Sequence, residues 1–207
     1  MLDKLNRGMV LIISSPSGAG KTTICKKLIE EVNNLNLSVS VTTRLKRSDE
    51  VDGKDYFFRS DKEFDDMVKQ EKFLEYAKVF DYSYGTLKSE IDTKIINGIN
   101  VIVDIDWQGT RQIEQHIPDD IVKIFILPPS INELEKRLGA RATESQDSFK
   151  KRMSEARKEI SHYSEYDFII INEDIQESVS KIKTILHSES LRKRRQVGLD
   201  EFVDNLI

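Results

Sequence analysis

Residues 10–23 read Val-Leu-Ile-Ile-Ser-Ser-Pro-Ser-Gly-Ala-Gly-Lys-Thr-Thr, an apolar run followed by a glycine-containing loop, a lysine and two hydroxyls. This order predicts a buried strand, a tight loop and the start of an amphipathic helix. The backbone N–H groups of such a loop can wrap a phosphate, and the helix adds its own unsatisfied N–H groups and the positive end of its dipole. Lys21 can then reach the outer phosphates of a nucleoside triphosphate while the Thr22 hydroxyl coordinates magnesium. The stretch therefore predicts a phosphate-binding loop.

The match to the full phosphate-loop pattern is incomplete, because the pattern has a glycine at the position of Ser15. Gly18 and Gly20 remain, and a residue without Cβ allows both the loop conformations and the close approach of a phosphate. The alternative is a tight turn with a solvated lysine, which does not explain so long a polar segment after a buried strand. The expected ATP-binding residues are Ser15, Pro16, Ser17, Gly18, Ala19, Gly20, Lys21, Thr22 and Thr23.

The composition bounds the class of protein. A chain of 207 residues can hold one α/β domain of good size. The formal net charge is −4, so we expect no nucleic-acid partner, since such partners usually need a basic surface. There is no run of about 18 apolar residues, and residues 1–8 lack the apolar core of a signal peptide. We therefore expect no membrane partner and a cytoplasmic location, and the composition leaves the oligomeric state undetermined.

The cysteine and histidine residues of the chain are too few and too scattered to form a metal site. Cys25 is the only cysteine, which excludes an internal disulfide and a cysteine-rich metal site. It falls in the helix predicted after Lys21, where we expect it to be a small buried residue. The three histidines are far apart in the sequence and lack ligand spacing, so we expect no protein-bound zinc.

Short apolar runs alternate with helical patterns along the chain. The runs lie at residues 9–14, 101–104, 121–127 and 168–172, and helical periodicity is clear at 22–32, 132–138, 149–163 and 175–186. Strands that alternate with helices predict a parallel sheet covered on both faces. Together with the phosphate loop, this predicts an α/β fold of the P-loop NTPase type.

Two segments interrupt that pattern. Residues 38–98 contain short alternating pieces and many aromatic side chains, which predicts a small inserted subdomain. Residues 139–152 are polar and contain arginines, and such a segment can close over a ligand as a lid. We therefore expect a single domain over residues 1–207 with a core of residues 1–37, 99–138 and 153–207. The basic run at residues 192–195 favours a solvated helix end over a nucleic-acid patch.

The first inserted segment contains two polar motifs that suggest a second half of the site. Residues 40–47, Ser-Val-Thr-Thr-Arg-Leu-Lys-Arg, offer guanidinium forks suited to a monophosphate. Residues 75–86, Glu-Tyr-Ala-Lys-Val-Phe-Asp-Tyr-Ser-Tyr-Gly-Thr, place a carboxylate among aromatic rings and hydroxyls, which suits a purine with donor groups on its edge. GTPases, ATPases and small-molecule kinases share the phosphate loop, so the loop does not identify the molecule that accepts the phosphoryl group. The two motifs have to provide the binding site for that acceptor.

The chain as a whole resembles the bacterial guanylate kinases. The resemblance runs nearly end to end and is carried by Ser-Pro-Ser-Gly-Ala-Gly-Lys at 15–21, Val-Thr-Thr-Arg at 41–44, Glu-Val-Asp-Gly-Lys-Asp-Tyr-Phe-Phe at 50–58, Asp-Ile-Asp-Trp-Gln-Gly at 104–109, Leu-Pro-Pro-Ser at 127–130 and Arg-Leu-x-x-Arg at 137–141. It implies transfer of the γ-phosphoryl group of ATP to GMP, giving ADP and GDP. It also implies Mg²⁺ as the cofactor, residues 38–98 as the GMP-binding insertion and residues 139–152 as the lid.

The resemblance further implies roles for individual residues. Those expected to act in catalysis are Lys21, Arg44, Arg137, Arg141 and Arg152. Those expected to bind GMP are Ser40, Arg44, Arg47, Tyr56, Glu75, Tyr84, Thr86 and Asp106. Within this set, Glu75, Thr86 and Asp106 are expected to recognise guanine. Asp104 is expected to orient Mg²⁺ through water, with Thr22 as a direct ligand.

Taken alone, the residues leave other interpretations open. Arg44 and Arg47 fit surface ion pairs, Tyr56 and Tyr84 fit core aromatics, and Arg152 fits a solvated face at the start of a basic helix. The chain could also be an interaction module that keeps the fold without the catalysis, although the intact residues 20–22 disfavour this. A kinase for a different acceptor is a third interpretation, which the carboxylate in the second polar motif disfavours.

Overall fold

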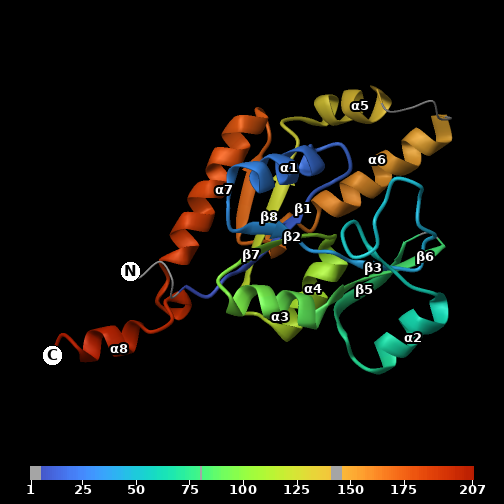
Figure 1. Ribbon diagram of the computed structural model, residues 1–207. Helices are drawn as coiled ribbons and strands as arrows, with labels where there is room; N and C mark the ends of the chain where they lie inside the picture. Colours follow the sequence, from blue (N-terminus) through green and yellow to red (C-terminus); the bar gives the residue numbers. More distant parts are fainter. Residues whose placement is uncertain (1–5, 80, 141–145) are drawn as a thin grey trace.

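The computed structural model describes residues 6–79, 81–140 and 146–207, in which a five-stranded sheet forms the centre (Figure 1). Its order is β2-β7-β1-β8-β9, and every neighbouring pair is parallel. The strands are β1 (Val10–Ser14), β2 (Leu35–Leu37), β7 (Asn100–Asp104), β8 (Ile121–Leu127) and β9 (Phe168–Ile171). The predicted parallel sheet is confirmed. The prediction did not include β2, because three residues are too few to show a pattern.

Alternate side chains of β1 serve two different cores, one on each face of the sheet. Leu11 and Ile13 pack in the core that includes residues of α1 and α7 and the buried Cys25, whereas Val10 and Ile12 pack in the core that includes residues of α3 and α4. The covering helices are α1 (Lys21–Glu31), α7 (Ile175–Ser190), α3 (Lys88–Ile96) and α4 (Trp107–His116). Figure 1 shows the two pairs on opposite sides of the strands. A strand buried on both faces is continuously apolar, which is why residues 10–13 lack alternation.

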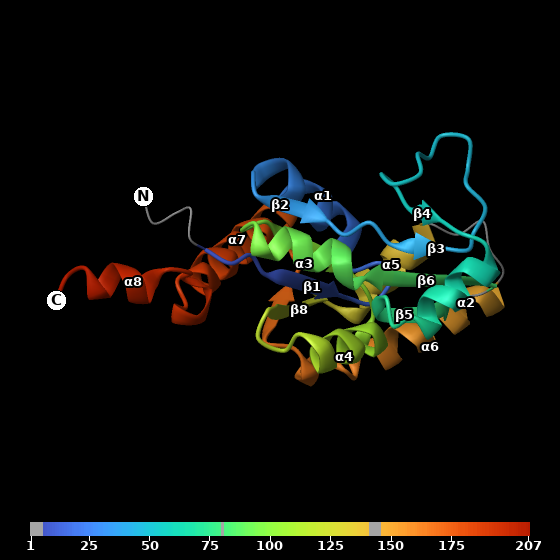
Figure 2. The same ribbon diagram turned by 60° about the horizontal axis from the view of Figure 1, so that its bottom comes forward.

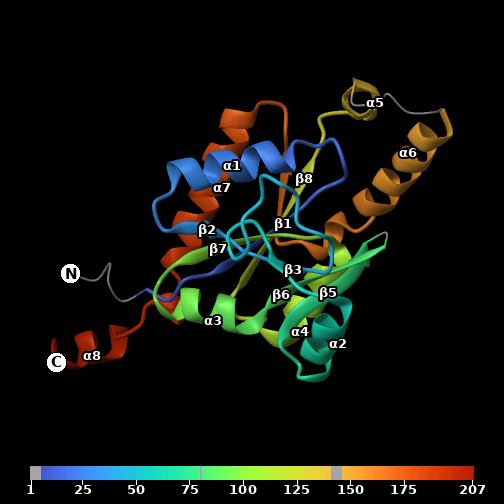
Figure 3. The same cartoon turned by 45° about the vertical axis from the view of Figure 1, so that its right-hand side comes forward.

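A second, four-stranded sheet lies beside the first and is covered by α2 (Figure 3). Its elements are β3 (Val41–Thr42), β4 (Phe57–Phe58), α2 (Asp61–Lys69), β5 (Phe73–Val79) and β6 (Tyr82–Leu87). Val41, Phe64 and Phe73 form its small core. The expected insertion of residues 38–98 also contains α3, but Ile91 and Ile95 of this helix pack on the five-stranded sheet.

Helices α5 (Ile131–Ala140) and α6 (Gln146–Ile160), at the upper right of Figure 1, pack on each other. Leu134 and Leu138 of α5 meet Met153 and Ala156 of α6 in a core of their own. Our expectation of Arg152 at the start of a helix is wrong, because α6 begins at Gln146 and Arg152 lies inside it. The apolar residues of α6 recur at helical spacing among the charged ones, so the helix forms despite its polar composition.

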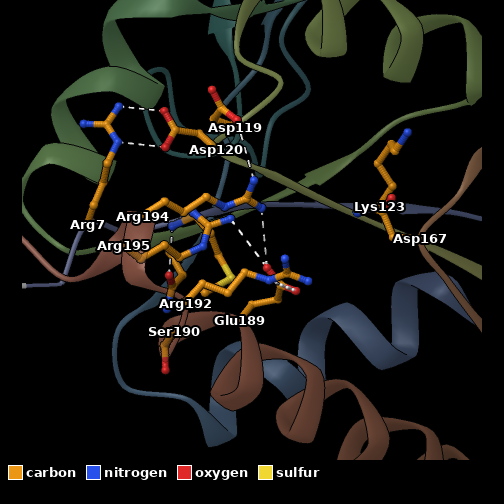
Figure 4. A network of polar contacts seen from close by, with 12 residues as sticks. Arg7, Asp119, Asp120, Lys123, Asp167, Glu189, Ser190, Arg192, Arg194 and Arg195 are labelled. Carbon is orange, nitrogen blue, oxygen red and sulfur yellow. Dashed lines mark hydrogen bonds and ion pairs between the residues drawn. The ribbon is translucent and has the colours of Figure 1, made fainter.

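The basic run at residues 192–195 follows the end of α7 and is exposed, as expected, at its first three residues, but the expectation is wrong for Arg195. Arg195 is 1% exposed, and its Nη1 donates a hydrogen bond of 3.4 Å to the carbonyl of Gly8. Figure 4 shows Arg194 and Arg195 turned toward the buried carboxylate of Glu189. Burial lowers the pKa of Arg195. The chain turns here through a 3₁₀ helix (Lys193–Arg195) against the segment before β1, and α8 (Leu199–Asp204) then runs away from the body (Figure 2).

Candidate active site

The loop between β1 and α1 encloses a cavity of about 320 Å³. Gly18 and Gly20 have φ of 90° and 98°, a region that favours glycine. A Cβ on Gly20 would lie 2.5 Å from Asn172 Nδ2, which donates a hydrogen bond of 2.7 Å to the carbonyl of Ala19. Ser15 does not have a positive φ, so its Cβ is tolerated where the pattern has glycine.

Nearly all of the predicted ATP-binding residues line this cavity. They are Ser15, Pro16, Ser17, Gly18, Gly20, Lys21, Thr22 and Thr23, joined by Asp104 and Glu159. Ala19 is fully buried beneath the loop instead. The loop is short and its residues are contiguous, so predicting the local conformation was enough to predict the lining.

Lys21 and Asp104 meet at the ends of two neighbouring strands. Strands β1 and β7 pair in parallel, so the residues that follow them leave the same edge of the sheet. Lys21 Nζ forms an ion pair with Asp104 Oδ1. Both side chains also line a second cavity of about 430 Å³, so the pair lies where the two cavities adjoin.

The second cavity gathers residues that are far apart in the sequence. Five of the eight predicted GMP-binding residues line it, with apolar walls from residues 77, 79 and 105. These five are Ser40, Tyr56, Glu75, Tyr84 and Asp106. The rings of Tyr56 and Tyr84 lie edge to face with their centroids 6.0 Å apart. Their hydroxyl groups and that of Ser40 are hydrogen-bond donors of a kind that suits an anion.

Glu75 is the buried carboxylate of the second cavity. It is 6% exposed, and the paired strands β5 and β6 place it opposite Thr86. Thr86 Oγ1 donates a hydrogen bond of 2.7 Å to Glu75 Oε1. Burial raises the pKa of Glu75, and the Thr86 hydrogen bond opposes this rise. Thr86 does not itself line the cavity, and its hydroxyl is linked to the cavity through the Glu75 carboxylate.

Asp106 lines the second cavity and also caps the N-terminus of α4. It is the N-cap of α4, and its Oδ1 accepts hydrogen bonds of 2.9 Å from the backbone N–H groups of Gln108 and Gly109. Capping of this kind fixes the direction in which the helix starts. The position of the carboxylate at the cavity wall is thus set by α4.

Two of the predicted phosphate-binding arginines do not line either cavity. Arg44 makes a bidentate ion pair with Glu50, with Nη2 to Oε1 at 2.6 Å and Nη1 to Oε2 at 3.1 Å. This pairing raises the pKa of Arg44. The guanidinium also lies 5.4 Å from the ring centroid of Tyr56, so it borders the cavity without facing it. Arg47 is exposed, and the roles of both remain predictions.

The lid arginines are also away from the cavities. Arg137 Nε donates a hydrogen bond of 2.9 Å to Glu133 one turn earlier on α5. Arg152 lies on α6. Neither side chain lines the loop cavity or the second cavity. Arg141 lies outside the described residues.

A family model described as guanylate kinase matches residues 7–189 of the chain. The chain belongs to the guanylate kinase family. Among its relatives, a guanylate kinase of Paramagnetospirillum magneticum is 48% identical over 200 residues, covering 97% of this chain and 94% of the relative. That of Nitrobacter winogradskyi is 49% identical, covering 97% and 91%. The crystal structure of guanylate kinase from Anaplasma phagocytophilum superposes with a TM-score of 0.78 at 36% identity, covering 99% of this chain and 97% of that one.

Membership of the guanylate kinase family confirms the resemblance seen in the sequence and the enzyme interpretation. Members phosphorylate GMP with ATP, so the chain is a nucleoside monophosphate kinase. Within residues 6–79, 81–140 and 146–207, no helix is both long and apolar enough to cross a membrane. The same residues contain no group of three or more histidine, cysteine or acidic side chains placed to hold a metal.

Two residues near the phosphate loop were not predicted as site residues. Asn172 supports the loop through Ala19 and accepts a hydrogen bond of 3.0 Å from Ser178 Oγ. A polar residue directly after the apolar strand β9 was a usable signal for it. Glu159, which lines the loop cavity from α6, had no such signal, because its place depends on how α6 packs.

Proposed function

We propose that the chain binds ATP with its phosphates in the loop cavity and GMP in the second cavity, and transfers the γ-phosphoryl group between them. The observation that supports this arrangement is the position of Lys21 and Asp104, which line both cavities. A donor phosphate in one cavity and an acceptor phosphate in the other then lie on either side of the lysine. Adjacent donor and acceptor sites support the proposal, because phosphoryl transfer needs the attacking and leaving oxygens in line.

The protein's own contribution is positioning and neutralisation of charge. An oxygen of the GMP phosphate is already a nucleophile, so no covalent intermediate on the protein is required. Lys21 is placed to stabilise the charge on the transferring group in the transition state. Arg137, Arg141 and Arg152, on or next to the lid segment at residues 139–152, add positive charge when α5 and α6 approach the loop.

The acceptor is selected by hydrogen bonds inside the second cavity. The buried Glu75 carboxylate accepts from N1–H and the exocyclic amine of guanine, with Asp106 alongside and Thr86 holding the carboxylate in place. Ser40, Tyr56 and Tyr84 donate to the phosphate of GMP. Arg44 and Arg47, from the same inserted segment, join them, and Arg44 exchanges part of its pairing with Glu50 for the phosphate.

The loop cavity also fits a magnesium ion. The Thr22 hydroxyl and the Asp104 carboxylate line it together, and Mg²⁺ prefers oxygen ligands of this kind. Thr22 would hold the ion directly and Asp104 through water. When bound, Mg²⁺ would offset the negative charge of the ATP phosphates.

An assay of ADP release tests this function. With ATP and Mg²⁺ present, GMP is expected to support rapid ADP formation, while AMP, CMP and UMP support little. Lys21→Met, at equal folded concentration, serves as the inactive control. Equal rates with GMP and AMP would contradict the assignment of the second cavity, and ADP release that needs no acceptor would indicate an ATPase.

A further inference from the structure

The first turn of α4 contacts both carboxylates that we assign to the recognition of guanine. Asp106 is the N-cap of this helix, and the backbone N–H of Gly109 donates a hydrogen bond of 2.9 Å to its Oδ1. A Cβ on Gly109 would lie 3.2 Å from Glu75 Oε2, so the Glu75 carboxylate packs against the same turn. The position of β5 relative to α4 therefore decides how far apart the two carboxylates lie.

Strand β5, which carries Glu75, lies at the edge of the four-stranded sheet and pairs there only with β6. Its register with β6 shifts between Phe73 and Glu75, and such irregularities next to active sites re-aim side chains. Leu74 and Glu75 are both buried, although neighbours on a regular strand point to opposite faces. The free edge of β5 also presents backbone N–H and C=O groups that need partners. Something other than β6 has to hold this edge.

Gln112 of α4 holds it, at the residue that follows Glu75. The backbone N–H of Tyr76 donates a hydrogen bond of 3.1 Å to Gln112 Oε1, and Gln112 Nε2 donates one of 3.3 Å to the carbonyl of Tyr76. One side-chain amide thus pairs both backbone groups, as a neighbouring strand would. Figure 3 shows α4 beside β5. The amide ties the strand that carries Glu75 to the helix that Asp106 caps.

We propose that Gln112 is a positioning residue for selection of the acceptor: by holding the backbone of Tyr76, it keeps the Glu75 carboxylate beside Asp106. That this carboxylate reads guanine rests on the proposed function. Gln112 does not line the second cavity, so its effect on the acceptor passes through Glu75. Without the amide, Glu75 is in place for a smaller fraction of the time, and the apparent affinity for GMP falls by that fraction.

The first test is steady-state kinetics of Gln112→Met, which keeps the length of the side chain and removes both hydrogen bonds. KM for GMP should rise about fivefold, the change that follows if Glu75 is then in place about one-fifth of the time. KM for ATP and kcat should change less than about twofold, because only binding of the acceptor is weakened. AMP lacks the donors that Glu75 reads, so the GMP-to-AMP ratio of kcat/KM should fall by the same factor as the affinity for GMP.

Two further variants show whether the hydrogen bonds are responsible. Gln112→Glu keeps an acceptor for the Tyr76 N–H and loses the donor to its carbonyl, so its KM for GMP should lie between those of Gln112→Met and the parent. Gln115→Met is the matched control, since Gln115 lies on the same helix and is exposed. It should keep the parental constants. An unchanged KM for GMP in Gln112→Met, or an equal rise in Gln115→Met, would overturn the proposal.

A double variant distinguishes positioning of Glu75 from a general loosening of the fold. In a chain that already carries Glu75→Gln, Gln112→Met should cause little further loss of kcat/KM for GMP, because residues that act through one another are not additive. A loss as large as in the parent would overturn the proposal. If Glu75→Gln alone leaves the GMP-to-AMP ratio unchanged, the proposed function is wrong at Glu75, and this single variant shows that failure without Gln112.

Hydrogen exchange of the Tyr76 amide, followed by NMR on the full chain without nucleotide, tests the contact independently of activity. Exchange should be faster in Gln112→Met than in the parent and unchanged in Gln115→Met, because an amide that loses its partner is less protected. Unchanged exchange in Gln112→Met would overturn the proposal even if the kinetic constants change. Faster exchange together with the selective rise of KM for GMP would support it.

Discussion

The two cavities of this kinase are built on opposite principles. The loop cavity is lined almost entirely by consecutive residues, 15–18 and 20–23. For a phosphate, these residues provide mainly backbone N–H groups and one lysine. The second cavity draws side chains from positions between 21 and 106. A backbone site tolerates changes in side chain, as Ser15 shows, but depends on conformations such as those of Gly18 and Gly20. A side-chain site can distinguish one ligand from another.

The largest expected effect falls on the selectivity of the side-chain cavity. Glu75→Gln replaces an acceptor that can take two hydrogen bonds from guanine with a group that presents a donor as well. Sites that hydrogen-bond a substrate reject analogues by about 10⁴ or more, so we expect the GMP-to-AMP ratio of kcat/KM to fall by about 10³. Steady-state assays with both acceptors measure this. Glu71→Gln, an exposed carboxyl near the start of β5, is the control, and a parental ratio in Glu75→Gln would remove Glu75 as the base reader.

Lys21, which the two cavities share, should affect rate and not selectivity. Lys21→Met removes a charge that stabilises the transition state, so kcat should fall by about 10² or more while the GMP-to-AMP ratio stays the same. Assays at saturating ATP and GMP measure it, and Lys26→Met on the exposed face of α1 is the control. A near-normal kcat with normal thermal unfolding would contradict the assignment of the loop.

Arg44 tests whether the acceptor side has its own phosphate site. Arg44→Ala should raise KM for GMP by about tenfold and leave KM for ATP nearly unchanged, because hydrogen bonds to charged groups contribute roughly 1.5–3 kcal/mol. Glu50→Gln is the opposing variant: it weakens the pairing that occupies Arg44 and should lower KM for GMP. Equal changes for the two nucleotides in Arg44→Ala would mean that the cavities are not separate half-sites.

The smallest expected effect comes from removing the hydrogen bond that Thr86 donates to Glu75. Burial already raises the pKa of Glu75, so kcat/KM for GMP should fall as the pH drops through that raised value and the carboxylate takes up a proton. Thr86→Val removes the hydrogen bond that opposes the rise, and the acidic limb of the profile should move to higher pH. Thr86→Ser keeps the hydroxyl and should keep the parental profile. A Val variant with an unshifted limb would show that Thr86 does not act through Glu75.

Much of the fold followed from local patterns. The continuous apolar run at 10–13 indicates a strand buried on both faces, and the parallel sheet confirms this. The patterns were least useful where tertiary contacts override composition. Arg195 belongs to a basic run that suggests solvation, yet the turn after α7 buries it against Glu189 and the carbonyl of Gly8. The first residues of α6 fell in the segment that we expected to be a polar lid, yet they belong to a helix whose apolar side chains pack on α5.

For the site, the sequence by itself determined the phosphate loop, because a loop of consecutive residues takes its shape from local backbone preferences. It also determined which residue types were available to select guanine. Only the tertiary structure decided that Ser40, Glu75 and Asp106 line one cavity, since strand pairing and the cap of α4 bring them together. It alone placed Glu159 in the loop cavity, because the position of a helix end depends on packing between helices and not on its own residues.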